Sequence, residues 1–123
     1  MNRPLSHYLE QMPLVAILRG ITPAESLDVV ACLLDAGIRI VEVPLNSPDP
    51  FDSIKLIAEK FGTQMLVGAG TVLNAEQVKD VAAAKGRLIV SPNTSEAVIK
   101  SAVALDMICV PGAATPSEVF TAL

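Results

Sequence analysis

The chain has 123 residues, a net charge of −4, and 51% apolar residues with no tryptophan and one tyrosine. This length suits one domain with one aliphatic core, so we treat residues 1–123 as a single domain. The acidic balance and the lack of a basic stripe argue against nucleic acid as a partner, and the apolar runs are too short to cross a membrane. The N-terminal segment lacks the apolar core of a signal peptide, which predicts a cytoplasmic protein.

Five apolar runs are typical of buried strands, and the segments between them carry apolar residues at helical spacing. The predicted strands are 14–18, 38–43, 65–67, 88–90 and 107–110, and the predicted helices are 23–35, 48–61, 75–84 and 94–105. The strands are apolar on both faces, as in parallel strands that helices cover. The strict alternation of strand and helix predicts an α/β fold.

The predicted helix boundaries repeat one pattern. Thr22 and Thr115 each precede a proline and, three residues on, a glutamate, which is the pattern of a capping box. The same scheme predicts that Asn74 caps the helix at 75–84 and that Asn93 caps the helix at 94–105. Glycines are predicted to end three helices, at Gly37, Gly62 and Gly86. The regular spacing of these units is that of a (β/α)8 barrel.

A closed (β/α)8 TIM barrel needs eight such units. The sequence contains five predicted strands and four complete predicted helices, with another helix beginning at Pro116. We therefore expect the N-terminal portion of a TIM barrel, truncated before its last strands. The alternative is an open doubly wound sheet, which needs a phosphate-binding loop at its switch point. The segment 68–73, Gly-Ala-Gly-Thr-Val-Leu, lacks the third glycine of such a loop.

Glu42 lies inside the apolar run 40–45. A buried carboxylate without a partner is destabilising or has a raised pKa, so it is retained where it is paired or performs chemistry. Arg19 ends the first predicted strand and is the expected partner. The two residues form either a structural ion pair or a functional pair. In the functional pair Arg19 binds a carboxylate and Glu42 acts as a general base.

Small and polar residues follow the other predicted strands. Gly70 and Thr71 follow the third strand and Pro92 follows the fourth. Each also has a purely structural interpretation, as a tight packing point or a turn. Cys32 and Cys109 are interpreted as small buried apolar residues. No cluster of histidine, cysteine or acidic residues has metal-ligand spacing, so we expect neither a metal nor a cofactor.

The lysines are predicted to lie away from the carboxyl ends of the strands. They fall on predicted helices or on the turns that lead back into strands, at Lys55, Lys60, Lys79, Lys85 and Lys100. In parallel barrels the active site is built at the carboxyl ends of the strands. The chain by itself is therefore not expected to form a Schiff base there.

The strand-end segments together resemble a known family. They occur in order as 16–23, 41–48, 68–73, 91–93 and 110–112. The set is similar to the class I aldolases that cleave 2-keto-3-deoxy-6-phospho sugar acids, and the resemblance covers nearly the whole chain. Pro44, Asn46 and Ser47 resemble the branch that acts on 2-dehydro-3-deoxy-6-phosphogalactonate. The phosphogluconate branch has threonine and arginine where this chain has Pro44 and Asn46.

The resemblance implies a trimeric TIM-barrel lyase of carbohydrate catabolism. Its reaction would release pyruvate and glyceraldehyde 3-phosphate through a lysine Schiff base, with the lysine on the sixth strand, outside this chain. Glu42 would be the catalytic proton shuttle. Substrate contacts are implied for Arg19, Asn46, Gly70, Thr71 and Pro92. The alternatives are a phosphogluconate-specific aldolase, another phosphate-binding barrel enzyme, or an inactive fragment that only self-associates.

Overall fold

The computed structural model describes residues 2–123 and contains one parallel sheet with helices between its strands. The strands are β1 (Val15–Ile17), β2 (Ile40–Pro44), β3 (Leu66–Gly70), β4 (Leu88–Ser91) and β5 (Ile108–Pro111). Their spatial order follows the chain, β1-β2-β3-β4-β5, and every neighbouring pair is parallel. A doubly wound sheet reverses its strand order at a switch point. The observed order contradicts that alternative and is the order of a (β/α) barrel.

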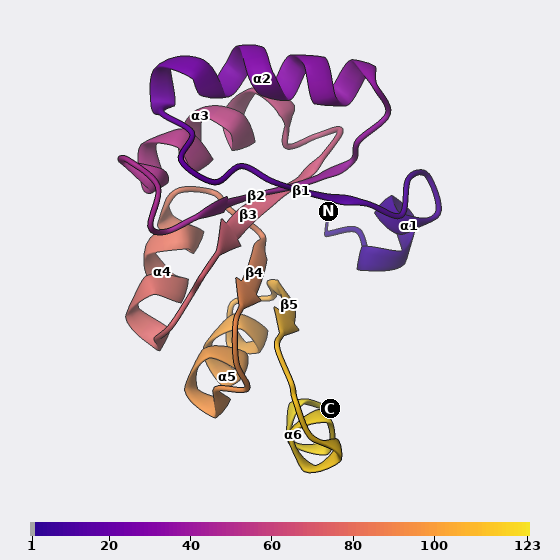
Figure 1. Cartoon of the computed structure of the whole chain (residues 1–123), viewed down its shortest axis with the longest axis vertical. Helices are drawn as coiled ribbons and strands as arrows, with labels where there is room; N and C mark the ends of the chain where they lie inside the picture. The colour runs from indigo at the N-terminus through magenta and orange to yellow at the C-terminus, as the bar shows by residue number, and fades with distance from the viewer. Residues whose placement is uncertain (1) are drawn as a thin grey trace.

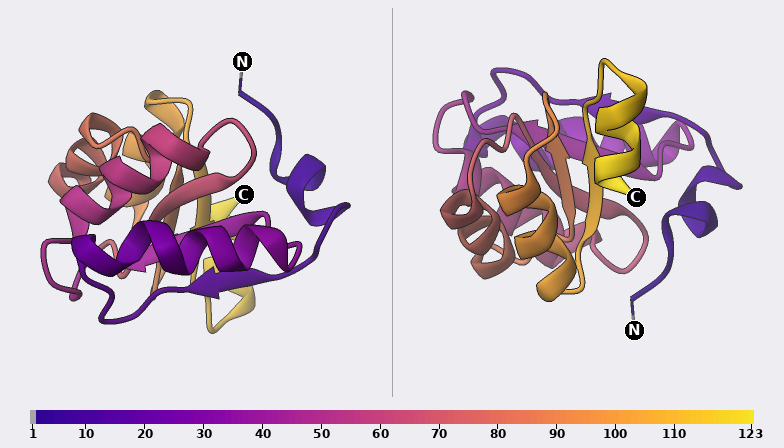
Figure 2. Two further views of the ribbon diagram at one scale, coloured as in Figure 1. Left: turned by 90° about the horizontal axis from the view of Figure 1, so that it is seen from above. Right: turned by 90° about the horizontal axis from the view of Figure 1, so that it is seen from below.

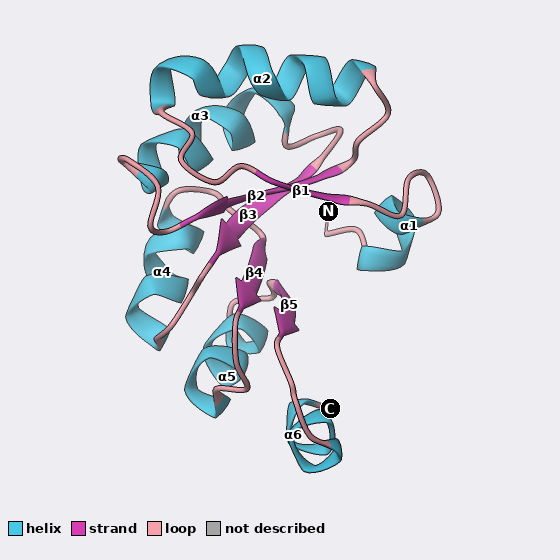
Figure 3. Cartoon of the chain, viewed as in Figure 1, coloured by secondary structure: helices cyan, strands magenta, loops and turns pink. Residues whose placement is uncertain are grey.

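The helices are α1 (Leu5–Leu9), α2 (Pro23–Asp35), α3 (Pro50–Phe61), α4 (Ala75–Ala83), α5 (Glu96–Ala104) and α6 (Pro116–Ala122). Figure 1 shows the sheet twisting from β1 to β5, with α2 to α5 arranged along its outer side. Helix α1 and the N-terminal end lie on the other, open side, whereas α6 with the C-terminus lies beyond β5, and the two views of Figure 2 also separate α1 from the outer helices. The colouring of Figure 3 shows the regular alternation of strand and helix along this arc.

Two groups of buried side chains occupy the two faces of the sheet. On the outer face, residues such as Val41 and Val43 pack against Val30, Ile54 and Ile57 of the helices. On the inner face lies a second cluster, formed by Tyr8, Ile40, Leu66 and Leu88. Because side chains alternate between faces along a strand, the even-numbered residues of β2 point inward. Helix α1 therefore covers the amino end of the inner face.

Most predicted boundaries are confirmed, and four expectations are corrected. The Thr22 capping box forms, the Thr115 hydroxyl caps α6 by accepting from the Glu118 amide, and Asn74 accepts a hydrogen bond from the Gln77 amide at 2.9 Å. The prediction that Asn93 caps α5 is wrong, because Ser95 is the N-cap and accepts from the Val98 amide. The five-residue helix α1 was not predicted.

The other two corrections concern single residues. The turn before β4 uses Lys85 in the left-handed region, with φ 66°, and the next residue, the predicted helix stop Gly86, has no positive φ. Cys32 is exposed on the surface of α2 instead of buried, and both cysteines are free. Because the outer face of α2 is open, a small residue there needs no packing partner.

The two outer strands leave apolar side chains open to solvent. Val15 is 45% exposed and Ile17 58% exposed on β1, and Val110 is 40% exposed on β5. An edge strand also presents unpaired backbone amides and carbonyls, which favours pairing with another chain. Each edge of the sheet is therefore a surface that a further strand can extend.

We expect the 123-residue chain to self-associate through these edges. Replacing Val15 and Ile17 together by lysine should lower association, because charged side chains on an edge strand oppose pairing. Leu73→Lys is the matched control, since Leu73 is 54% exposed but lies outside the strands. Sedimentation equilibrium over a concentration series measures the outcome. Equal effects of the edge and control variants would show that general hydrophobicity, not the strand edge, drives association.

Candidate active site

Glu42 lies at the centre of β2 with only 4% of its surface exposed. It shares the inner face of the sheet with Ile40, so it points away from the helices. Its Oε2 atom is buried and has no hydrogen-bond partner. The sequence prediction of a buried carboxylate within a strand is therefore confirmed.

Gly70, at the end of β3, makes room for this carboxylate. A Cβ atom built on Gly70 would overlap Oε2 of Glu42, so any side chain at this position would force the Glu42 carboxylate to move. In the β2–β3 register Gly70 pairs with Pro44 and Gly68 pairs with Glu42, so two glycines face the glutamate from the neighbouring strand. The contact that the structure establishes for Gly70 is thus with Glu42.

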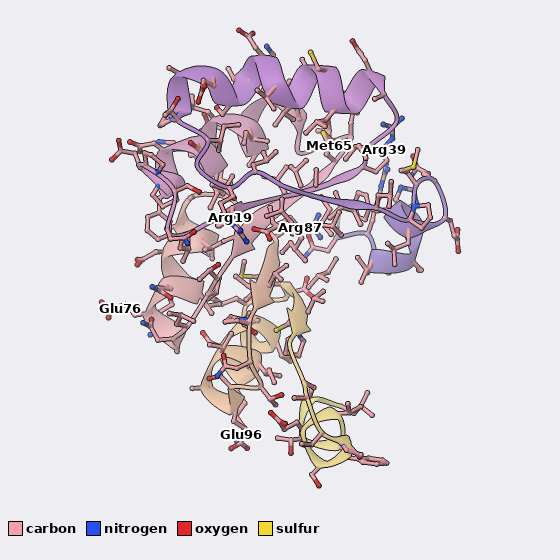
Figure 4. All side chains as sticks on the ribbon, in the orientation of Figure 1. Arg19, Arg39, Met65, Glu76, Arg87 and Glu96 are labelled. Atoms are coloured by element: carbon pink, nitrogen blue, oxygen red, sulfur yellow. The ribbon has the colours of Figure 1, made fainter. Side chains whose placement is uncertain are left out.

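Arg19 follows β1 and lies near Glu42 without forming a direct ion pair. The ion pairs among residues 2–123 are Lys85–Glu59 and Lys100–Glu96, so the predicted Arg19–Glu42 pair is corrected to a longer-range interaction. Figure 4 shows Arg19 beside the middle of the sheet, whereas Glu76 and Glu96 project outward from their helices. Arg19 also lines a hollow of about 280 Å³ together with Gly20 and Glu25.

The environment of Glu42 favours its protonated form. Burial raises the pKa of the Glu42 carboxyl above its ordinary value, and the positive charge of Arg19 lowers it by a smaller amount. Desolvation dominates because no donor contacts the buried oxygen. A raised pKa brings a carboxyl group closer to the range in which it can both hold and accept a proton, which is what a general acid–base group requires.

The other predicted site residues lie at the same edge of the sheet but differ in exposure. Thr71 is half-buried directly after β3, with φ 56° in the left-handed region. Asn46 is exposed in the β2–α3 loop. Pro92 is exposed after β4 and lines a hollow of about 280 Å³ with Asn93 and Gly112. The parallel strands therefore gather all of these residues at their carboxyl ends.

Sequence reasoning did not assign Ser47 to the site, although the structure ties it to Arg19. The Ser47 hydroxyl accepts a hydrogen bond from the Gly20 amide at 3.0 Å, and the residue is 6% exposed. The signal in the sequence was a small polar residue at the end of the second predicted strand, which was used only for the branch resemblance. Its burial depends on how the β1–α2 and β2–α3 loops pack together.

A larger hollow, of about 490 Å³, lies at the opposite end of the strands. Arg3, Tyr8, Thr63 and Arg87 are among the residues that line it. It opens near the amino ends of β3 and β4, so it is separate from the carboxyl edge where barrel enzymes bind their substrates. Over residues 2–123, no three histidine, cysteine or acidic side chains are placed to share a metal ion.

None of the five lysines reaches the carboxyl edge. Lys55 and Lys60 lie on α3, Lys79 on α4 and Lys100 on α5, while Lys85 pairs with Glu59 in the turn before β4. The predicted placement of the lysines is confirmed. In the part of the chain that the structure describes, no helix combines the length and apolarity needed to span a bilayer.

A parallel sheet whose strands follow chain order, with a helix after each strand, is the arrangement of part of a (β/α) barrel of the TIM-barrel class. The family described as "Aldolase: KDPG and KHG aldolase" matches residues 5–123. The chain belongs to this aldolase family. The chain spans about half the length of these curated relatives that it matches.

Individual relatives agree with this assignment. The 2-dehydro-3-deoxy-6-phosphogalactonate aldolase of Escherichia coli K12 is 50% identical over 92% of this chain and 55% of its own length. A solved structure described as native KDPGal has a TM-score of 0.89 and 50% identity over 91% of this chain and 54% of its own. The structure of the KDPG aldolase of Legionella pneumophila, with pyruvate captured as a covalent carbinolamine, has a TM-score of 0.83. Its sequence is 27% identical, and the match covers 91% of this chain and 54% of that one.

We expect Glu42→Gln to stabilise the chain increasingly as pH rises. An unfolded glutamate titrates near its ordinary pKa of 4.5, whereas burial raises the pKa of the folded Glu42 carboxyl. Between these two values the folded state binds more protons, so the free energy of unfolding of the parent chain falls as pH rises. Glutamine does not titrate. The advantage of the variant should therefore grow across this window and then become constant.

Urea unfolding of both chains at several pH values from about 4 to 8 measures this effect. Glu59→Gln is the control of opposite sign. The hydrogen bond and charge of Lys85 lower the pKa of Glu59, so that interaction stabilises the chain above pH 4.5 and is lost as pH falls. A Glu42→Gln advantage that is independent of pH would contradict the raised pKa.

Proposed function

We propose that this chain supplies the acid–base and carboxylate-binding part of an aldolase active site. The reaction is the cleavage of 2-dehydro-3-deoxy-6-phosphogalactonate to pyruvate and glyceraldehyde 3-phosphate. The observation that carries this proposal is the buried Glu42 carboxyl, unpaired and with a raised pKa, in a chain of the KDPG and KHG aldolase family. The Schiff-base lysine comes from a segment outside these 123 residues, since no lysine lies at the carboxyl edge.

In this mechanism the lysine amine condenses with the C2 ketone of the substrate and releases water, which gives a protonated imine. Glu42, directly or through a water molecule, takes the proton of the C4 hydroxyl. The C3–C4 bond breaks, its electron pair moves into the imine as an enamine, and the aldehyde leaves. Protonation of the enamine at C3 and hydrolysis of the imine release pyruvate and restore the lysine. A Glu42 carboxyl with a raised pKa suits both proton transfers.

Arg19 would bind the substrate carboxylate in this scheme. A guanidinium group recognises a carboxylate through two parallel N–H donors. Because Arg19 forms no direct ion pair with Glu42, its donors are available to a substrate. Thr71, Gly70, Pro92 and Asn46 would surround the same ligand from the next strand ends. Assembly as a homotrimer and a cytoplasmic location complete the proposal and stay predictions.

A chimera tests the activity. Residues 1–123 would be joined to the remaining segment of the 50% identical Escherichia coli relative. We expect the chimera to cleave the substrate and to form a covalent adduct with pyruvate that borohydride traps, whereas the 123-residue chain forms none. Glu42→Gln in the chimera should lower kcat by about 10²- to 10⁴-fold, the usual contribution of a general acid–base group.

Glu76→Gln is the control, because Glu76 is exposed in the first turn of α4 and projects outward. Circular dichroism confirms that each variant is folded. A folded chimera that gives no adduct with pyruvate, or whose cleavage requires a metal, would refute the Schiff-base proposal. A Glu42→Gln variant that loses structure but keeps its rate per folded molecule would make Glu42 a structural residue.

Substrate choice gives a second test. We expect the chimera to have a higher kcat/KM for the phosphogalactonate substrate than for its C4 epimer from phosphogluconate. The combined Pro44→Thr and Asn46→Arg substitution should shift the ratio toward phosphogluconate, by about tenfold or more if a hydrogen bond to the substrate changes. A strong preference of the parent chimera for phosphogluconate would assign the chain to the other branch.

A further inference from the structure

Ser47 is the buried member of an otherwise open stretch of loop. Its neighbours Asn46 and Pro48 are exposed, whereas Ser47 is 6% exposed. The Ser47 amide donates to the Pro44 carbonyl at 2.9 Å, which folds the loop back after β2. This turn points the serine hydroxyl toward the end of β1.

The hydroxyl meets a turn that contains Arg19. The Ile21 amide donates to the Leu18 carbonyl at 3.2 Å, and Gly20 has φ +79°, which is the pattern of a type II β-turn with Arg19 and Gly20 at its central positions. The central amide, that of Gly20, takes no part in the bond that closes the turn. It donates instead to Oγ of Ser47 at 3.0 Å.

Types I and II differ mainly in the orientation of the central peptide unit. A partner for the Gly20 amide therefore selects one orientation of the Arg19–Gly20 peptide. The residue before Arg19 is also anchored, because the Leu18 amide donates to the carbonyl of Glu42 at 2.9 Å. Both neighbours of Arg19 are thus held in place: Leu18 by the backbone of Glu42, and Gly20 by the side chain of Ser47.

We propose that Ser47 is a positioning residue, whose buried hydroxyl fixes the Arg19–Gly20 peptide and thereby the place of the Arg19 guanidinium relative to Glu42. The inference deepens the proposed aldolase function, and the catalytic role of Ser47 rests on that function. Its structural part stands on the hydrogen bond between the two loops.

Arg19 is the charged group that influences Glu42 in the described structure. Strands β1 (Val15–Ile17) and β3 (Leu66–Gly70), which flank β2, contain no titratable side chain, and His7 and Tyr8 of α1 lie at the far, amino end of the sheet. The charge of Arg19 lowers the pKa of Glu42 against the larger effect of burial. Releasing Arg19 from its position should therefore raise the Glu42 pKa further.

The test is a titration of the Glu42 side-chain carboxyl by carbon-detected NMR in the 123-residue chain, which requires no enzymatic activity. We expect Ser47→Ala to raise the Glu42 pKa relative to the parent, in the same direction as Arg19→Gln. In the Arg19→Gln background, Ser47→Ala should have no further effect, because the two substitutions act through the same charge. Ser53→Ala is the matched control: Ser53 is fully buried and its hydroxyl has no hydrogen-bond partner.

Ser47→Thr and Ser47→Val form a second pair of variants. The two new side chains have nearly the same shape, but only threonine keeps a hydroxyl. Threonine should keep the parent pKa of Glu42 and valine should raise it, whatever the effect of alanine on folding. An unchanged Glu42 pKa in Ser47→Val would overturn the proposal. So would a rise of the Glu42 pKa by Ser47→Ala that is as large in the Arg19→Gln background as in the parent.

In the active chimera, Ser47→Ala should raise KM by about 2- to 10-fold, the value of one hydrogen bond, with a smaller change in kcat. An inactive chimera would refute the proposed function and leave the titration result unaffected.

Discussion

A carboxylate placed inside a parallel sheet is the constraint on which the site depends. Glu42 occupies a position where an aliphatic residue would be stable, and its Oε2 is buried without a donor. The sheet accepts it because Gly70 has no side chain and leaves space beside it. The strand register that places glycine next to glutamate therefore sets both the position and the raised pKa of this group.

Arg19 reduces this electrostatic penalty without removing it. A direct ion pair would hold the pKa of Glu42 low and would occupy the guanidinium. The longer separation in the structure leaves the carboxyl able to exchange a proton and leaves the arginine able to bind an anion. The position of Arg19 is consequently as important to the site as its charge, and that position is set by a tight turn and its contact with the neighbouring loop.

The features that were predictable from the sequence are those that depend on local patterns. Apolar periodicity located the five strands and helices α2 to α5, and the threonine–proline–glutamate pattern located the starts of α2 and α6. Helix α1 is too short for a periodic signal, and the packing of its Tyr8 into the cluster with Ile40, Leu66 and Leu88 accounts for it. At α5, both Asn93 and Ser95 can cap a helix. The Thr94 hydroxyl bonds the Gly112 carbonyl at 2.6 Å, so the preceding loop is held to β5 and the helix begins later.

The site itself was predictable in its members and not in its geometry. Glu42 and Arg19 were found because charged residues are unusual at the ends and centres of apolar strands. The distance between them depends on the φ +79° turn at Gly20, and the space beside Glu42 depends on the pairing of β2 with β3. The β2–β3 pairing and the Gly20–Ser47 hydrogen bond that holds this turn join segments more than twenty residues apart, which periodicity does not encode. The general base and the carboxylate anchor of the proposed reaction are thus positioned by contacts between β1, β2 and β3, so this half of the site can be organised before any lysine from outside the chain is in place.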